Sequence, residues 1–227
     1  MFTGFSEKTG GFLWELAFHN ERPWFLAHKQ EFEDFVNTPF KALAADTLAE
    51  MQRRLPGFAG YVHVSRIYRD ARRLFGRGPY KDHLWFTLWG SEVSKHGPAF
   101  WFELGPASYA FGLGFWETSS AQMAVYRRMI DANPARFLRL AGAVERGGWT
   151  LTGEAYKRPK ALHGDALLDA WYNLKNVGVQ KRFDLGGDAF TPRLPGLLAD
   201  AFCELMPLYR FLAELWAACP EAPERPR

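Results

Sequence analysis

The feature of this sequence that most constrains its fold is a change in the spacing of apolar residues. Up to residue 55 they recur at helical intervals, and from 61 to 115 they alternate along short segments separated by Gly, Pro and Ser. Alternation with period two is typical of strands, and a spacing of three to four is typical of helices. We therefore expect strands at 61–68, 84–89, 99–104 and 109–115, the last two joined by a hairpin.

Helical patterns flank this strand meander on both sides. Before it, apolar spacing predicts a helix around 12–17, and proline-containing starts predict helices after Asn20 and from 38 to 55. After it, we expect helices at 119–132, 134–146 and 165–174, strands at 149–156 and 177–183, and one closing helix from Thr191-Pro192. This order predicts an α+β fold. Its sheet is mostly antiparallel and aromatic-rich, with four meander strands plus one or two later strands, packed with N-terminal, middle and C-terminal helices.

No linker-like or repeated stretch divides the 227 residues. A chain of this length can bury a substantial core as one unit. Its 9 Trp and 20 Phe indicate a core rich in rings, each of which buries roughly 150–250 Å². We therefore expect a single domain over residues 1–221, followed by a flexible Pro-rich tail over 222–227.

Two features predict the compartment. The N-terminus lacks the basic and apolar regions of a signal peptide, and no stretch approaches the ~18 consecutive apolar residues of a membrane span. The two cysteines, Cys203 and Cys219, are typical of a reducing environment rather than of a disulfide framework. Together they predict a cytoplasmic protein with no membrane partner. The net charge of +3 is too small to predict nucleic-acid binding by itself.

Established motifs for catalysis and cofactor binding are missing from the sequence. It has no P-loop, no G-x-G-x-x-G, no H-E-x-x-H, no C-x-x-C and no G-x-S-x-G. The 6 histidines are scattered, without the spacing of a metal-binding helix. The sequence therefore predicts no metal site, points to no particular cofactor, and leaves open whether the protein is an enzyme.

The expected meander strands are apolar on both faces. Leu84, Phe86 and Leu88 point one way, and Trp85, Thr87 and Trp89 point the other. Such a sheet is either covered on both sides or lines a cleft with one of them. Gly112 and Gly114 add room for something to approach their strand closely.

One segment is more basic than the rest of the chain. From 66 to 81 it carries Arg66, Arg69, Arg72, Arg73, Arg77 and Lys81 against Asp70 alone. Guanidinium groups bind phosphate and carboxylate with two parallel hydrogen bonds, and a glycine turn such as 76–79 can direct N–H groups at an anion. The alternative is structural, with Arg69 and Asp70 fixing the loop by salt bridges.

Glu103 falls in the middle of an expected strand beside Trp101. A carboxylate is costly to bury without a partner, so we expect Glu103 to meet an arginine. The alternative is a general acid/base role.

A set of short motifs runs in order to about residue 183: Gly4-Phe5, Asn20 with Trp24-Phe25, Arg69-Asp70-x-Arg72, Pro79-Tyr80-Lys81, Gly112-x-Gly114 with Trp116, Arg127-Arg128 and Arg158-Pro159-Lys160. In these motifs the chain resembles a widespread, mainly bacterial family of conserved hypothetical proteins, a domain of unknown function. The chain departs from the family pattern at Arg73, where the pattern has Phe, and at 74–77. The resemblance implies a cytoplasmic α+β domain and no established activity.

The resemblance makes the basic loop the best candidate for a functional face. We expect it to bind an anionic ligand, either a phosphorylated small molecule such as a nucleotide or a nucleic-acid backbone. Arg72 and Lys81 hold the anion in this hypothesis, Asp70 orients Arg69, and Trp24 or a meander tryptophan stacks on a ring. The expected ligand-binding residues are Arg69, Arg72, Tyr80, Lys81, Asn20 and Trp24.

Two other functions stay open. One is a hydrolase or phosphoryl-transfer enzyme in which Asp70 or Glu103 is the acid/base and Tyr80 donates a proton. The other is a protein-interaction domain that uses exposed rings.

Overall fold

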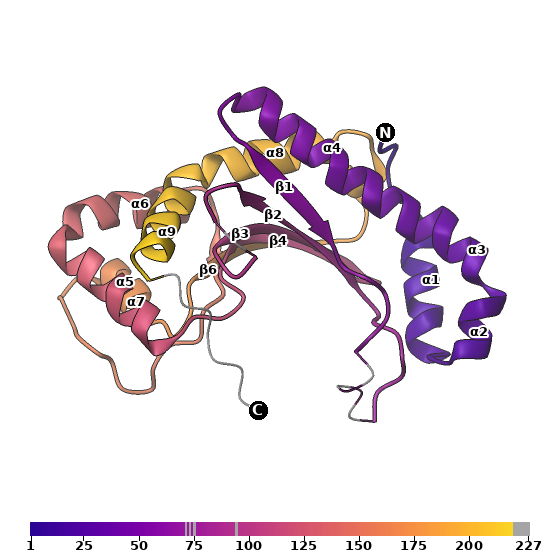
Figure 1. Cartoon of the computed structure of the whole chain (residues 1–227), viewed down its shortest axis with the longest axis horizontal. Coiled ribbons are helices and arrows are strands. Elements are labelled where there is room, and N and C mark those ends of the chain that lie inside the picture. The colour runs from indigo at the N-terminus through magenta and orange to yellow at the C-terminus, as the bar shows by residue number, and fades with distance from the viewer. Residues whose placement is uncertain (71, 73, 75, 94, 220–227) are drawn as a thin grey trace. The chain divides into compact units, whose positions relative to one another are not determined.

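The computed structural model describes residues 1–70, 72, 74, 76–93 and 95–219 (Figure 1). Arg73 and the expected tail at 222–227 lie outside the described residues. The chain opens with α1 (Glu7–Phe18), α2 (Arg22–Ala27), α3 (Lys29–Phe32), a π-helical turn (Glu33–Asn37) and α4 (Thr38–Arg54). The strands are β1 (Gly60–Val64), β2 (Leu84–Gly90), β3 (Ala99–Leu104), β4 (Ser108–Gly114), β5 (Thr150–Leu151) and β6 (Gly178–Asp184). The later helices are α5 (Ser120–Ala132), α6 (Pro134–Arg146), α7 (Ala166–Tyr172), a 3-10 turn (Gly187–Phe190), α8 (Leu194–Glu204) and α9 (Met206–Ala218).

The strands form one six-stranded sheet in the order β1-β2-β3-β4-β6-β5. It is antiparallel, and its last pair sets Thr150 opposite Gln180. The α+β class, the four-strand meander and both later strands are thereby confirmed. Among the described residues, no helix has both the length and the apolar character needed to cross a membrane.

The chain divides into two compact units. Unit 1 consists of Met1–Leu88, Trp101–Phe111 and Arg182–Ala201. Unit 2 consists of Trp89–Phe100, Gly112–Lys181 and Phe202–Arg227. Strands β2, β3, β4 and β6 contribute residues to both units, so each unit is described by itself below.

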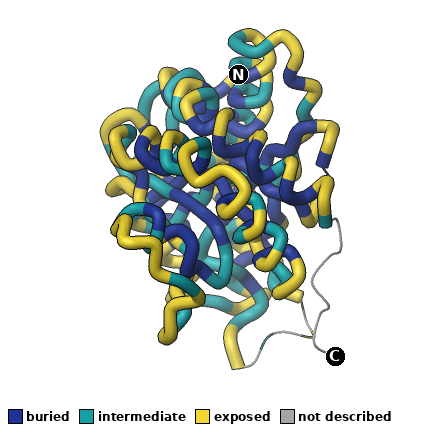
Figure 2. Tube along the Cα trace, turned by 90° about the vertical axis from the view of Figure 1, so that its left-hand side faces the viewer, coloured by how far each residue is buried: buried dark blue, intermediate teal, exposed yellow. Residues whose placement is uncertain are grey.

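In unit 1 one face of the sheet is packed and the other is partly open. Phe86 and Phe102 stack with their ring centroids 5.4 Å apart, and Phe40 of α4 lies 5.8 Å from Phe86. These three side chains are fully buried, because α4 runs alongside β1 over this face (Figure 1). Figure 2 shows how buried, intermediate and exposed residues are distributed along the chain. The opposite face keeps four half-buried side chains, which we call the open sheet face: Trp85, Thr87, Trp101 and Glu103.

Unit 2 is built around rings that the last two helices supply. Phe100 of β3 stacks on Phe202 of α8 at 5.0 Å and on Tyr209 of α9 at 4.9 Å. The Tyr209 hydroxyl accepts a hydrogen bond of 2.9 Å from the Gly90 amide. Aromatic stacking of this kind adds stability beyond the burial of area alone, so these contacts anchor the sheet of unit 2.

The prediction of a single closing helix is wrong. Two helices, α8 and α9, meet at Leu205, and Pro207 lies in the first turn of α9. Proline has no amide hydrogen and its ring clashes with the carbonyl four residues earlier. A continuous helix is therefore broken at this point.

The room at Gly112 and Gly114 is taken by the neighbouring strand. A Cβ atom added at Gly112 would collide with the Val179 carbonyl oxygen, and one at Gly114 would lie 2.6 Å from the Val177 carbonyl oxygen. The close approach predicted from these glycines therefore exists, and the backbone of β6 and of the preceding Val177 makes it.

Candidate functional site

The two ends of the basic loop pair with each other in unit 1. The Arg69 amide donates to the Pro79 carbonyl, and the Lys81 amide donates to the Ile67 carbonyl, both at 2.8 Å. Tyr68 and Tyr80 form an antiparallel bridge between these bonds. The side chains at both ends of the loop are therefore held on a short, hairpin-like stem.

A side chain from the start of the protein holds this stem. Asn20 donates from Nδ2 to the Tyr80 carbonyl at 2.9 Å and accepts from the Tyr80 amide at Oδ1, also at 2.9 Å. A Cβ atom at Gly78 would collide with the Asn20 side chain. Glycine is thus needed at residue 78 because Asn20 occupies the space beside it.

Tyr80 belongs to the core of unit 1. Its side chain is 2% exposed and stacks on Phe25 with ring centroids 4.3 Å apart. Burial raises the pKa of the Tyr80 hydroxyl. The backbone of Tyr80 is part of the loop stem, and its ring packs among aromatic side chains of the core.

Arg69 is mostly buried and points along the stem. Its Nε donates to the Tyr80 carbonyl at 2.8 Å, and its Nη2 lies 3.8 Å from Asp82 Oδ1. The Nδ1 atom of His83 lies 2.9 Å from the same carboxylate oxygen. Burial acts to raise the pKa of Asp82, but the His83 hydrogen bond and the charge of Arg69 outweigh it and lower the pKa.

Asp70 and Arg72 form a pair at the exposed end of the loop. The Arg72 Nη2 atom donates to Asp70 Oδ2 at 2.7 Å, and the Arg72 side chain is 87% exposed. The hydrogen bond from Arg72 to Asp70, with their Coulomb attraction, raises the pKa of Arg72. An exposed pair of this kind contributes little to stability.

Lys81 is the least ordinary charge of the loop. It is half-buried, and its Nζ lies 5.7 Å from the centroid of the Trp85 ring. Burial, and then the neighbouring charges of Arg69 and Arg66, lower the pKa of Lys81 from the usual 10.5 to about 8. We call Arg66, Arg69, Lys81 and Trp85 the Lys81 cluster.

The Lys81 cluster adjoins the open sheet face through Trp85. His63 of β1 lies on the same side, with its ring 5.6 Å from that of Trp85. Glu103 lies 4.0 Å from Arg182 of β6, an arginine outside the basic segment. Rings and charges thus lie together on one accessible surface of unit 1.

Trp24 lies in the N-terminal helices, between two imidazoles. Its ring stacks on His28 at 4.2 Å and on His19 at 5.6 Å. The structure therefore brings Asn20, Tyr80, Arg69 and Lys81 together around the loop stem, with Arg72 at the exposed end. Sequence reasoning left Arg66 and Trp85 out of the expected ligand-binding set, although both carry a signal: one lies in the basic segment and the other alternates with buried residues along β2.

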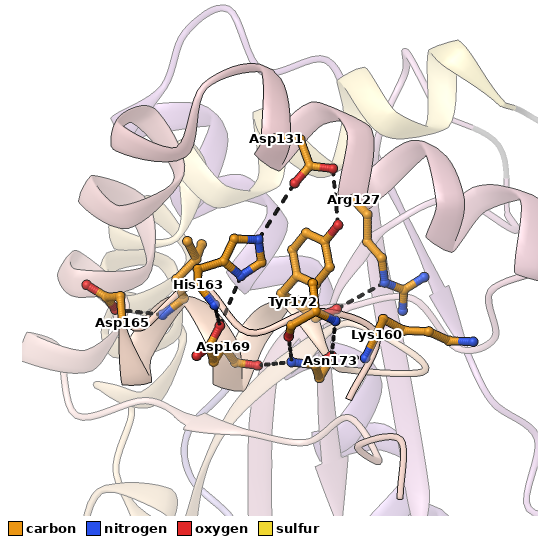
Figure 3. Close-up of polar contacts among 10 residues, drawn as sticks. Arg127, Asp131, Lys160, His163, Asp165, Asp169, Tyr172 and Asn173 are labelled. Carbon is orange, nitrogen blue, oxygen red and sulfur yellow. Dashed lines mark hydrogen bonds and ion pairs between the residues drawn. The ribbon is translucent and has the colours of Figure 1, made fainter. Parts of the chain in front are cut away.

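A second polar cluster lies in unit 2 and ties a loop to two helices (Figure 3). The Arg127 guanidinium donates to the carbonyls of Tyr172 at 3.1 Å and Leu174 at 2.9 Å. Figure 3 shows His163 between two carboxylates, with Nδ1 2.9 Å from Asp169 and Nε2 3.8 Å from Asp131. The hydrogen bonds from the His163 backbone and ring lower the pKa of Asp169.

Asn173, the residue that follows α7, holds the same loop. It accepts at Oδ1 from the Lys160 amide at 2.6 Å, and its own carbonyl accepts from the Tyr156 amide at 2.9 Å. Both ends of the segment 156–160 are therefore fastened to one residue. The Lys160 and Lys175 ammonium groups lie 4.5 and 5.9 Å from the Tyr156 ring centroid. The polar groups of this cluster form their hydrogen bonds with other groups of the protein, which favours a structural role for the cluster.

In the described part of the chain, no group of three or more His, Cys, Asp or Glu side chains is arranged to hold a metal ion.

The fold and the site define an α+β protein with a basic loop beside an aromatic sheet face, a combination that identifies no reaction. The family model for a conserved hypothetical protein, DUF2461, matches residues 8–211, and the chain belongs to this family. Among curated proteins, none matches the chain. The family expected from the sequence motifs is thereby confirmed.

Proposed function

We propose that unit 1 binds a small phosphate-bearing ligand at the Lys81 cluster. The observation that carries this proposal is a half-buried ammonium group flanked by the guanidinium groups of Arg66 and Arg69. Grouped cations destabilise one another when water is partly removed, and a bound anion relieves that repulsion. Among the described residues, the cluster forms one ion pair, in which Arg69 lies 3.8 Å from Asp82. Its positive charge is therefore only partly neutralised within the protein.

The open sheet face supports a ligand that also carries a planar group. Trp85 is shared by the cluster and this face, and Trp101 lies half-buried on the neighbouring strand β3. Stacking of one base on an aromatic side chain contributes about 1–3 kcal/mol. A nucleotide therefore matches the site better than inorganic phosphate does.

A small ligand is favoured over a nucleic-acid strand. A strand requires a basic track that follows several phosphates. In the described residues of the loop, Arg72 is paired with Asp70 and Arg77 is exposed, which leaves Arg66, Arg69 and Lys81 grouped at the stem.

Thermal unfolding with a ligand panel tests the proposal. The panel contains phosphate, pyrophosphate, nucleotides, sugar phosphates and short DNA and RNA strands at two salt concentrations. A ligand at 100 times its dissociation constant stabilises the folded state by about 2.7 kcal/mol, a shift of several degrees. We expect a nucleotide to raise the unfolding temperature more than inorganic phosphate does. Either Lys81→Met or Arg66→Ala should remove this shift.

Lys41→Met is the matched control, because Lys41 is exposed on α4 and its replacement removes the same charge. A shift that survives Lys81→Met, or that Lys41→Met removes equally, would contradict the proposed site. A shift produced by the strands alone, with a steep loss at high salt, would assign the loop to nucleic acid.

A further inference from the structure

Lys81 differs from an ordinary surface lysine in its surroundings. Its backbone is fixed in the loop stem by the hydrogen bond from its amide to Ile67, its ammonium group lies near the Trp85 ring, and the side chain is half-buried. None of the ion pairs among the described residues includes Lys81, since the nearby carboxylate of Asp82 is engaged by Arg69 and His83. The Trp85 ring favours the charged form of this amine, whereas burial and the charges of Arg69 and Arg66 disfavour it.

We propose that Lys81 is a nucleophilic amine that forms an imine with a small aldehyde or ketone carrying a phosphate or carboxylate group. This inference rests on the proposed function, because Arg66 and Arg69 would hold the anionic group of the same molecule. It narrows the ligand from any phosphate-bearing compound to one that also has a reactive carbonyl group.

The surrounding charges favour the neutral amine that this reaction needs. Burial disfavours the ammonium form, and among the described residues so do the charges of Arg69 on the stem and of Arg66, which lies between β1 and the stem. With a pKa of about 8, a substantial fraction of Lys81 is neutral near physiological pH. A lysine that is desolvated or next to another cation is a recognised form of activated nucleophile.

The reaction balances without an oxidant or a reductant. The lone pair of the neutral Lys81 nitrogen forms a bond to the carbonyl carbon, and the carbonyl oxygen takes up a proton to give a carbinolamine. Loss of that oxygen as water then forms the C=N bond, so one amine and one carbonyl compound yield one imine and one water molecule. The Trp85 ring supplies an apolar wall for the carbon skeleton of the bound compound.

The test uses the full chain and pyridoxal 5′-phosphate, a probe with an aldehyde, a ring and a phosphate. The imine is reduced with borohydride, the protein is digested, and each lysine is quantified by mass spectrometry. We expect Lys81 to be modified on the order of ten-fold faster than the exposed Lys41. The rate should reach half of its maximum near pH 8 rather than near 10.5.

Three controls make the outcome decisive. Pyridoxal, which lacks the phosphate, should modify Lys81 much more slowly, inorganic pyrophosphate should protect Lys81, and Arg66→Ala should reduce its rate while leaving the rate at Lys41 unchanged. Modification of Lys81 no faster than Lys41 would overturn the inference. If pyrophosphate then still stabilises the protein in a Lys81-dependent manner, the proposed anion site stands and only the imine falls. The inference would also be overturned if pyridoxal modified Lys81 as fast as pyridoxal 5′-phosphate does and pyrophosphate gave no protection. The substrate would then not be recognised by an anionic group.

Discussion

Asn20 and Tyr80 exchange two hydrogen bonds of 2.9 Å across a sequence separation of 60 residues. The amide group of Asn20 satisfies both the donor and the acceptor of the Tyr80 backbone. The N-terminal helices thus set the position of the residue that precedes Lys81.

Replacement of Asn20 by alanine should destabilise unit 1. It leaves the Tyr80 amide without its partner in a largely buried place and leaves the Tyr80 carbonyl with the Arg69 hydrogen bond, which costs about 1–3 kcal/mol. Urea denaturation followed by Trp fluorescence measures the loss. Gln30→Ala removes an exposed amide that bonds to Asp34 and should change stability by less than about 0.5 kcal/mol. An Asn20→Ala protein as stable as Gln30→Ala would refute the role assigned to this contact.

A double-mutant cycle should couple Asn20 to Gly78. A Cβ atom at residue 78 collides with the Asn20 side chain, so Gly78→Ala is expected to cost about 1–3 kcal/mol. In the Asn20→Ala background the same change should cost much less, because the obstacle is gone. Residues in contact show interaction energies of about 0.5–3 kcal/mol in such cycles. Additive effects of the two replacements would show that the collision is avoided in another way.

Lys81→Met should raise stability at neutral pH. The folded state lowers the pKa of Lys81 from 10.5 to about 8, so below pH 8 the charged lysine destabilises the fold. Between pH 8 and 10.5 the unfolded chain binds more protons, and this penalty disappears as pH rises. After allowance for partial exposure, we expect a gain of roughly 1–2 kcal/mol at pH 7 and almost none at pH 11. Denaturation at both pH values checks this, with Lys41→Met as the control; an equal effect at the two pH values would argue against the lowered pKa.

Arg127→Met should destabilise unit 2. It removes the donors to the carbonyls of Tyr172 and Leu174 at the end of α7, for an expected cost of about 2–4 kcal/mol. Arg128→Met is the control, because Arg128 is exposed on the same helix and carries the same charge. Hydrogen exchange of the amides of Tyr156 and Lys160 should accelerate only in the Arg127 variant. Similar behaviour of both variants would mean that general charge, rather than this contact, matters.

The sequence was sufficient for features that depend on local pattern. Alternation of apolar residues predicts the strands that contain Phe86 and Phe102. A sheet with one buried face requires this period of two whichever helix covers that face. The sequence does not predict the break at Pro207. Proline is tolerated in the first turn of a helix, so Pro207 alone does not show whether one helix continues or a second helix begins there.

The candidate site was only partly predictable for a related reason. The basic segment and Lys81 could be recognised from composition, whereas the burial of the Tyr80 ring depends on Phe25, and the approach of Lys81 to Trp85 depends on the pairing of the loop ends. These are contacts between segments far apart in the chain, and no local spacing encodes them. The same holds for Gly112, whose close neighbour is the carbonyl of Val179 on a later strand.

The attachment of the basic loop to Asn20 has a consequence for any attempt to use the loop alone. A peptide covering 66–81 would lack the amide group that satisfies the Tyr80 backbone and the Phe25 ring that packs on Tyr80. The Lys81 ammonium group would then sample many conformations instead of being held 5.7 Å from the Trp85 ring. The loop is therefore not a portable motif, and grafting it onto another scaffold would require the first two helices to travel with it.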